Sequence, residues 1–133
     1  ACAAAVATID VMKEEKIVEA AAQIGEKVIG PALHELAKKH KIIGEVRGQG
    51  VFWALDLVTD RATKAPLAPY GGTSPAMGEV VAECKKRGLM PFSNFNRIHV
   101  VPPCNVSEAE VREGIAILDE ALSTIGKYYE GKD

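Results

Sequence analysis

The sequence predicts an α+β fold, a small and mostly antiparallel sheet with helices packed on one face. Two observations carry this prediction. Apolar residues recur at helical spacing in several separate stretches, and a period of two marks a strand between them. Along the 133 residues the elements follow the order helix, helix, strand, strand, helix, strand, strand, helix. This order is typical of α+β domains, whose helices lie against an antiparallel sheet.

The N-terminal third is predicted to be helical with two interruptions. Residues 1–12 are mostly strong helix formers, and a polar break follows at residues 13–16. An apolar stripe at helical spacing then runs from Ile17 to about His40, and we expect it to pack across the sheet. Pro31 interrupts this stripe. Because proline lacks an amide donor and clashes with the preceding turn, a kink or a restart is expected there.

A central strand is predicted at residues 51–58. Its alternate apolar residues fall on one face: Val51, Trp53, Leu55 and Leu57. The opposite face also begins apolar, so helices should cover one face and the other should be at least partly covered. A shorter strand at residues 42–46 leads into it. Gly48 and Gly50 lie between the two strands, where we expect unusual dihedral angles or a close approach of the backbone.

Residues 59–72 are rich in polar residues, glycine and proline and are predicted to form a loop. Ser74 and Pro75 then begin a helix, with the serine as its cap and the proline at its first position. Gly88 ends this helix.

The last part of the chain predicts two strands and a long helix. The strands cover residues 89–92 and 97–101, with a turn at residues 93–96, and two prolines stop the second strand. Ser107 and Glu110 have the spacing of a capping box, and the helix that they begin runs to about Ile125. The tail from residue 130 is expected to fray.

Composition excludes several classes of function. The formal net charge of -2 predicts no general attraction for nucleic acid or for an anionic membrane. No apolar run is long enough to span a bilayer. The three cysteines lack the spacing of a zinc site or a disulfide framework, so we expect reduced thiols and a cytoplasmic location. The alanine-rich start, without a leader or an initiator methionine, indicates a piece of a longer chain.

One stretch carries a family resemblance. Val46-Arg47-Gly48-Gln49-Gly50, followed by an apolar strand with Asp56, resembles the C-terminal small domain of class-III pyridoxal-phosphate aminotransferases, the omega-amino-acid transaminases. The element order is similar over essentially the whole chain. The resemblance implies that residues 1–133 form this small domain, with residues 1–13 as the tail of the interdomain helix.

The same resemblance implies a function. The parent protein would use pyridoxal phosphate to move an amino group between an amino donor and a keto acid, as a homodimer. The lysine, the acidic partner and the phosphate-binding groups for this cofactor lie on the family's large domain, upstream of Ala1. The resemblance therefore implies no catalytic, cofactor-binding or metal-binding residue in this chain, and the isolated chain should be inactive.

Arg97 is the candidate substrate-binding residue. The resemblance places an arginine for the substrate carboxylate between Gly88 and Pro103, and Arg97 is the only arginine in that window. Its planar fork suits paired hydrogen bonds to a carboxylate. The family's usual position falls near Phe92, five residues earlier. Either Arg97 binds the carboxylate from a shifted loop, or the substrate has a more apolar end. If the role of Arg97 is structural, its side chain lies on the sheet surface or makes an ion pair between domains.

Two further residues have a structural and a functional interpretation. His99 shares a strand face with Arg97 by period two, and it would hydrogen-bond a ligand if that face borders a cleft. The ordinary alternative is a structural histidine. Arg47 either holds the glycine turn in place or reaches the edge of the pocket.

The remaining candidates are predicted to be structural. His34 and His40 lie near a helix end, where a solvated or dipole-stabilising role is ordinary. Cys84 falls on an apolar helix face and is expected in the core. Cys104 follows two prolines and is expected to be exposed, with no histidine beside it to activate the thiol.

Two hypotheses of another class stay open from the sequence. One is a free-standing α+β binding or regulatory module that recognises a small anion through Arg97. The other is a structural dimerisation piece, which fits an apolar N-terminal helix that lacks its partner.

Overall fold

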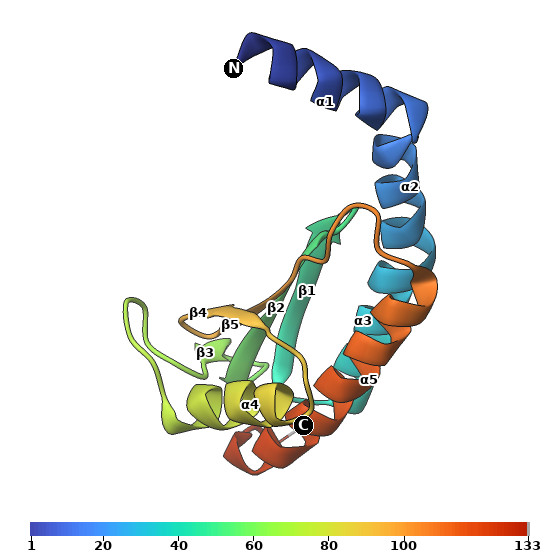
Figure 1. The fold of residues 1–133 in the computed structure, drawn as a ribbon. Coiled ribbons are helices and arrows are strands. Elements are labelled where there is room, and N and C mark those ends of the chain that lie inside the picture. The colour runs from blue at the N-terminus through green and yellow to red at the C-terminus, as the bar shows by residue number, and fades with distance from the viewer. Residues whose placement is uncertain (133) are drawn as a thin grey trace.

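The computed structural model describes residues 1–132 and is built on an antiparallel sheet (Figure 1). Its strand order is β1 (Ile43–Gln49), β2 (Phe52–Asp60), β5 (Arg97–Val100) and β4 (Phe92–Asn94). A two-residue strand, β3 (Ala65–Pro66), pairs with the end of β2. The predicted α+β class and the central place of β2 are confirmed.

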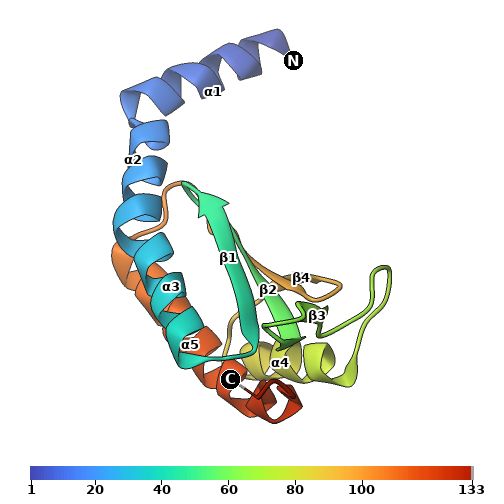
Figure 2. The same cartoon turned by 180° about the vertical axis from the view of Figure 1, so that it is seen from behind.

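Three helices cover one face of the sheet, and Figures 1 and 2 show this layer from opposite sides. They are α3 (Gly30–Lys39), α4 (Pro75–Lys86) and α5 (Glu108–Ile125), which a short 3-10 turn, η2 (Gly126–Tyr128), extends. The capping box predicted at Ser107 and Glu110 is present, and so is the serine cap of Ser74 on α4. These caps satisfy the first free amides of both helices.

The core lies between this helical layer and the sheet. The alternation predicted for β2 is confirmed, because Leu55 and Leu57 are fully buried and Trp53 is nearly so. The helices contribute the other large side chains with almost no exposure: Leu33, Val80, Cys84, Leu122 and Ile125. Burial of this apolar surface is the main driving force for the fold.

The N-terminal helices extend away from this body. Figure 1 shows α1 (Cys2–Glu14) projecting from the rest of the chain, and none of its residues is buried. Lys16 has a left-handed φ of 51° and separates α1 from α2 (Ile17–Ile24), which confirms the predicted polar break. α1 exposes four large apolar side chains: Val6, Ile9, Val11 and Met12.

The interruption predicted at Pro31 takes the form of a π-helical turn. This turn, η1 (Gly25–Ile29), joins α2 to α3 without a break in the helical path. Pro31 has no N–H for the carbonyl one turn earlier, at Lys27, so regular α-helical bonding cannot continue there. The helix widens into a π-helical turn at this place, and α3 follows without a side-chain N-cap.

Gly48 and Gly50 show the two features predicted for them, a close approach of the backbone and an unusual dihedral angle. Gly50 starts the two-residue turn between β1 and β2 with a φ of +55°. A Cβ at Gly48 would lie 2.4 Å from the carbonyl oxygen of Phe52, so the close strand approach requires glycine. As a result β1 continues to Gln49, beyond the predicted residues 42–46.

The strand predicted at residues 89–92 is displaced and runs from Phe92 to Asn94. The amide of Leu89 bonds the carbonyl of Cys84 at 2.9 Å and so belongs to the end of α4. Pro91 has no amide to offer a neighbouring strand. The turn before β5 is therefore shorter than predicted and consists of Phe95 and Asn96.

Two further expectations are corrected. The predicted loop at residues 59–72 contains the strand β3 and the last residues of β2. The tail does not fray at residues 130 and 131, because both amides bond the carbonyl of Thr59, at 2.7 and 3.2 Å. Asp133 lies outside the described residues.

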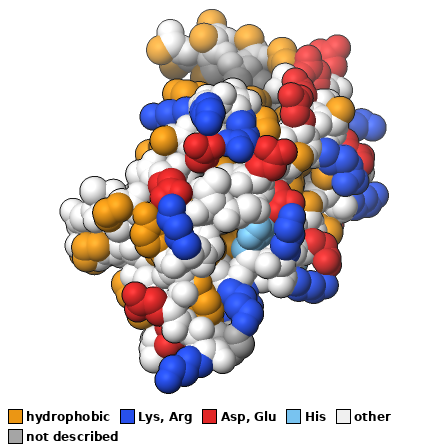
Figure 3. Space-filling model, turned by 90° about the horizontal axis from the view of Figure 1, so that it is seen from below, with side chains coloured by type: hydrophobic (Ala, Val, Ile, Leu, Met, Phe, Trp, Pro, Cys, Tyr) orange, Lys and Arg blue, Asp and Glu red, His pale blue; other side chains and the backbone are white. Residues whose placement is uncertain are grey.

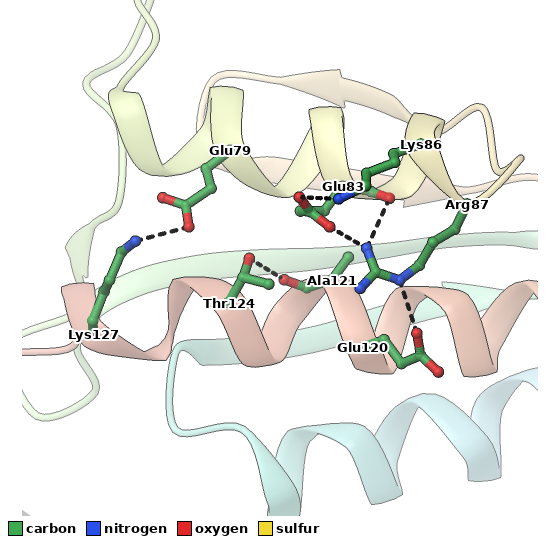
Figure 4. Close-up of polar contacts among 8 residues, drawn as sticks. All are labelled: Glu79, Glu83, Lys86, Arg87, Glu120, Ala121, Thr124 and Lys127. Atoms are coloured by element: carbon green, nitrogen blue, oxygen red, sulfur yellow. Dashed lines mark hydrogen bonds and ion pairs between the residues drawn. The ribbon is translucent and has the colours of Figure 1, made fainter.

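Polar contacts join α4 to the end of α5 (Figure 4). Arg87 pairs with Glu83 on its own helix and, at 2.8 Å, with Glu120 on α5. Lys127 pairs with Glu79 at 2.8 Å. Figure 3 shows acidic and basic side chains intermixed on the face seen from below. Among residues 1–132, no helix is both long and apolar enough to cross a membrane.

Candidate functional site

The sheet face opposite the helices carries the candidate site. Strand alternation places Ala54 and Asp56 on this open face, because Trp53, Leu55 and Leu57 point into the core. Asp56 is opposite Arg97 in the β2–β5 register, and Ala54 is opposite His99. Arg97 and His99 therefore share the open face, as predicted.

Arg97 has unused hydrogen-bonding capacity. Its Nε lies 3.8 Å from Oδ1 of Asp56, a distance of an ion pair but not of a hydrogen bond. Its guanidinium carbon lies 5.8 Å from the centre of the Phe95 ring. The side chain is 31% exposed and donates no hydrogen bond to any described residue. Its five N–H groups can therefore bind an incoming anion.

Arg47 forms an ion pair with Asp56. Its Nη2 makes a close contact with Oδ2 of Asp56, across the β1–β2 pair. Its Nη1 lies 3.6 Å from Glu45. Because Arg47 is bound to Asp56 in this way, the carboxylate does not depend on Arg97 as its only counter-ion. Arg47 thus pairs the two strands and also lines the hollow described next.

A hollow of about 370 Å³ lies beside these residues on the open face. Its charged lining residues are Glu45, Arg47, Asp56, Lys64 and Arg97. Three cations against two carboxylates leave the lining with an excess of one positive charge. This excess of positive charge is complementary to a small anion.

His99 lies one row further along the same face, between two aromatic rings. Its ring centre is 5.1 Å from that of Phe92 and 6.2 Å from that of Phe52. Burial and the nearby Arg97 charge lower the pKa of His99, so the imidazole is neutral at pH 7. Its Nε2 is buried and has no hydrogen-bond partner among the described residues.

None of the other candidate residues lines this hollow. Cys84 is in the core, where burial raises the pKa of its thiol, and Cys104 is exposed. His34 is exposed, with its ring 6.3 Å from that of Trp53. His40 corrects the prediction of a solvated histidine, because it is 8% exposed and its Nε2 lies 2.5 Å from Asp119 on α5. Helix packing buries this ring.

Arg61 was missed by the sequence analysis because it falls in the predicted loop. Its guanidinium donates to the carbonyls of Ala37, His40 and Ile43, and it thereby satisfies the end of α3. Lys64, also in that loop, lines the hollow. No sequence pattern marks either residue.

Cofactor and metal chemistry would each need particular side chains. Every lysine among residues 1–132 is exposed, whereas a Schiff-base lysine works in a desolvated pocket. Within the same residues, no group of three His, Cys, Asp or Glu side chains is arranged to hold a metal ion. The unused donors of Arg97 and the positive lining of the hollow favour an anion on this face.

Comparison with known proteins identifies the family. The family described as aminotransferase class-III matches residues 1–122. The chain belongs to the class-III aminotransferases. The resemblance stated from the sequence is therefore confirmed.

Relatives within the class-III aminotransferases differ in their reactions. The chain is 35% identical over 132 residues to ethanolamine-phosphate phospho-lyase homolog 1 from Caenorhabditis elegans, covering 96% of this chain and 27% of that protein. It is 35% identical over 128 residues to the 5-aminovalerate aminotransferase DavT of Pseudomonas putida, covering 94% and 28%. A taurine–pyruvate aminotransferase of Bilophila wadsworthia is 32% identical, with 92% and 27% covered.

Solved class-III structures share the fold. The taurine:2-oxoglutarate aminotransferase of Bifidobacterium kashiwanohense, solved with PLP and glutamate, superposes with a TM-score of 0.87 at 27% identity, over 96% of this chain and 28% of that one. An amine transaminase from an uncultivated Pseudomonas species gives 0.83 at 30% identity, over 92% and 27%. The chain thus spans about a quarter of the length of the proteins it matches.

Proposed function

We propose that residues 1–133 are the C-terminal small domain of a pyridoxal-phosphate-dependent transaminase, with residues 1–13 as the tail of the interdomain helix. The parent protein transfers an amino group between an amino donor and a keto acid. Arg97 binds the substrate carboxylate. The observation that carries this role is a partly exposed guanidinium that lines a hollow and donates no hydrogen bond to residues 1–132.

In this proposal the cofactor is bound outside this chain. Pyridoxal phosphate supplies the electron sink of such reactions, and a large domain of the same polypeptide holds it. The parent protein is a cytoplasmic homodimer. The exposed apolar side chains of α1, which are Val6, Ile9, Val11 and Met12, support a further partner surface, because contiguous exposed apolar side chains commonly mark an interaction site.

Within this chain, Arg97 orients the substrate and Asp56 orients Arg97. A carboxylate that approaches the open face finds the guanidinium fork with free donors. Asp56 stays paired with Arg47 when the ligand arrives, so no carboxylate is left without a cation. Binding of the substrate carboxylate therefore requires little rearrangement of the charged side chains.

The comparisons favour a transaminase over a free-standing anion-binding module, because the family match covers nearly the whole chain. A second candidate is a lyase reaction within the same family. The phospho-lyase homolog is as similar to this chain as the 5-aminovalerate aminotransferase, at 35% identity. An activity assay should therefore follow both amino transfer and the release of phosphate.

The test uses the full-length parent protein with pyridoxal phosphate. Substrates are taurine, 5-aminovalerate and ethanolamine phosphate as donors, with pyruvate and 2-oxoglutarate as acceptors. Arg97→Gln should raise the KM of the acid-bearing substrate about 10- to 100-fold, because a charge-assisted hydrogen bond contributes about 1.5–3 kcal/mol. Arg97→Lys should recover only part of this loss, since an ammonium cannot reproduce the planar fork.

The matched control is Arg112→Gln. Arg112 pairs with Glu108 on α5, and both side chains are largely exposed. This variant should keep the kinetic constants of the wild type. An unchanged KM in Arg97→Gln would refute the role of Arg97, and the absence of both amino transfer and phosphate release would refute the proposed reaction.

A further inference from the structure

A separate cavity of about 170 Å³ lies between helix α5 and strand β5. Three segments line it: Leu89 and Met90 between α4 and β4, Val100 with the residues that follow β5, and the first half of α5. It shares no lining residue with the hollow beside Arg97. This cavity is therefore distinct from the site proposed for the substrate carboxylate.

The deepest lining residues of the cavity are apolar. Ile98, Val111 and Leu118 line it and are 1%, 5% and 2% exposed. Met90 and Val101, at 80% and 49% exposed, also line it and so lie at its mouth. A molecule that enters past these two side chains exchanges water for an apolar surround, which is favourable for apolar groups.

The titratable lining residues, Glu110 and His99, leave no free charge for a ligand. The carboxylate of Glu110 accepts hydrogen bonds from the amide and the hydroxyl of Ser107, at 2.9 and 2.7 Å. These bonds lower the pKa of Glu110, so the group stays ionised and bound to the helix cap. The imidazole of His99 is neutral. An ionic ligand would thus find no unpaired counter-ion along this lining.

Gly114 leaves room in the cavity wall. It lies inside the 18-residue helix α5, where glycine is less stable than alanine. Its backbone does not require glycine, because its φ is not positive and an added Cβ would meet only Cδ1 of Leu89, at an ordinary 3.6 Å. The consequence of the missing side chain is space beside Leu89, at the centre of the lining.

We propose that this cavity binds a small, neutral, apolar molecule with about the bulk of one methyl-substituted aromatic ring. An apolar cavity of about 150 Å³ holds a benzene ring. A docked protein fits less well, because a stable interface buries about 800 Å² on each partner. Of the described lining residues, only Met90 and Val101 present large exposed apolar side chains. The proposal does not depend on the reaction of the parent protein.

The test is an NMR titration of the chain with toluene and with benzoate, which carries a carboxylate where toluene carries its methyl group. Toluene should bind saturably and at least about tenfold more tightly than benzoate, because a buried carboxylate without a partner is costly. The shifted methyl signals should be those of Leu89, Val111 and Ile115, which line the cavity.

Substitutions at Gly114 should close the cavity in steps. Gly114→Ala should weaken toluene binding about threefold and Gly114→Leu at least about tenfold, since each removes part of the volume. The matched controls are Gly78→Ala and Gly78→Leu, because Gly78 lies on α4, does not line this cavity, and has open space for a Cβ. Both controls should bind toluene as the wild type does. Retained peak dispersion shows folding, and the alanine pair decides if Gly114→Leu is unfolded.

The proposal is overturned if toluene binding does not saturate, if benzoate binds as tightly, or if Gly114→Ala and Gly78→Ala bind toluene equally well. The same titration is then made on the longer parent protein, where Gly114→Ala should weaken binding to the same extent. Toluene binding to the chain but not to the parent would mean that another part of the parent fills the cavity, and this result also overturns the proposal. Because binding is measured without turnover, a parent protein without transaminase or lyase activity leaves this test intact.

Discussion

Gly25 lies directly against the carbonyl of Gly50, where the π-helical turn crosses the tip of the β1–β2 hairpin. A Cβ at position 25 would lie 2.0 Å from that carbonyl oxygen. The same oxygen accepts a hydrogen bond from Nε1 of Trp53 at 2.7 Å. The helical arm and the central strand therefore meet through backbone atoms, with no room for a side chain.

Gly25→Ala should destabilise the chain by about 3 kcal/mol, because the added methyl group forces the helix away from the hairpin. The measurement is the free energy of unfolding from urea titration. Gly78→Ala is the matched control, since Gly78 lies inside α4 and a Cβ there meets nothing within 4 Å. It should be stabilising by about 0.5–1 kcal/mol. Equal effects of the two substitutions on stability would contradict the close contact between Gly25 and the carbonyl of Gly50.

Arg61→Ala should also lower stability, by about 3 kcal/mol. The substitution leaves three carbonyls without their charged donor, two of them at the end of α3. Arg61→Lys should recover less than half of the loss, because an ammonium cannot reach three acceptors in this geometry. Thermal unfolding would measure both, with the exposed Arg112→Ala expected to stay within about 0.5 kcal/mol of the wild type.

Asp119 should make stability depend on acid pH. Burial raises its pKa, but hydrogen bonds from Lys39 and His40, with their charges, outweigh burial and hold the pKa below the ordinary 3.8. A lowered folded-state pKa means that this stabilisation is complete above 3.8 and is lost as the pH falls through the lower value. Unfolding free energies of the wild type and Asp119→Asn should therefore converge as the pH is lowered from about 6 to 2.

A constant difference between these two proteins across that pH range would refute the assignment. Asp10→Asn serves as the control, because Asp10 lies exposed on the projecting helix α1. Its unfolding free energy should follow that of the wild type at every pH.

Ser107→Ala should destabilise α5 by about 1 kcal/mol, since the hydroxyl of Ser107 accepts from the amide of Glu110 and closes the capping box. Urea titration measures the change. Ser123→Ala removes a hydroxyl that bonds a carbonyl within the same helix, and its effect should stay within about 0.5 kcal/mol. If both substitutions cost the same, the cap makes no special contribution.

Local patterns predicted the elements of this fold but not all of their boundaries. The alternation around Trp53 and the capping box at Ser107 depend on neighbouring residues, and both predictions are confirmed. The strand near Phe92 was placed three residues too early, because the amide of Leu89 is taken by α4. Such competition between two elements for one amide is not visible in the sequence.

The candidate site was predicted only in part. Period two correctly placed Arg97 and His99 on one face, and the substrate-binding role of Arg97 stays a prediction. The neighbours that define the site come from elsewhere: Arg47 from β1, Asp56 from β2, and Lys64 from the loop before β3. Their approach depends on strand register, which sequence spacing does not fix.

From the sequence alone came the α+β class and the order of helices and strands, because periodicity and capping act between residues close along the chain. The stretch around Arg47 carried the resemblance to the family. Only the tertiary structure decided that Arg47 forms an ion pair with Asp56, so that Arg97 keeps free donors. It also decided that His40 is buried against Asp119. These outcomes depend on contacts between distant segments, whose geometry is set by the packing of the whole core.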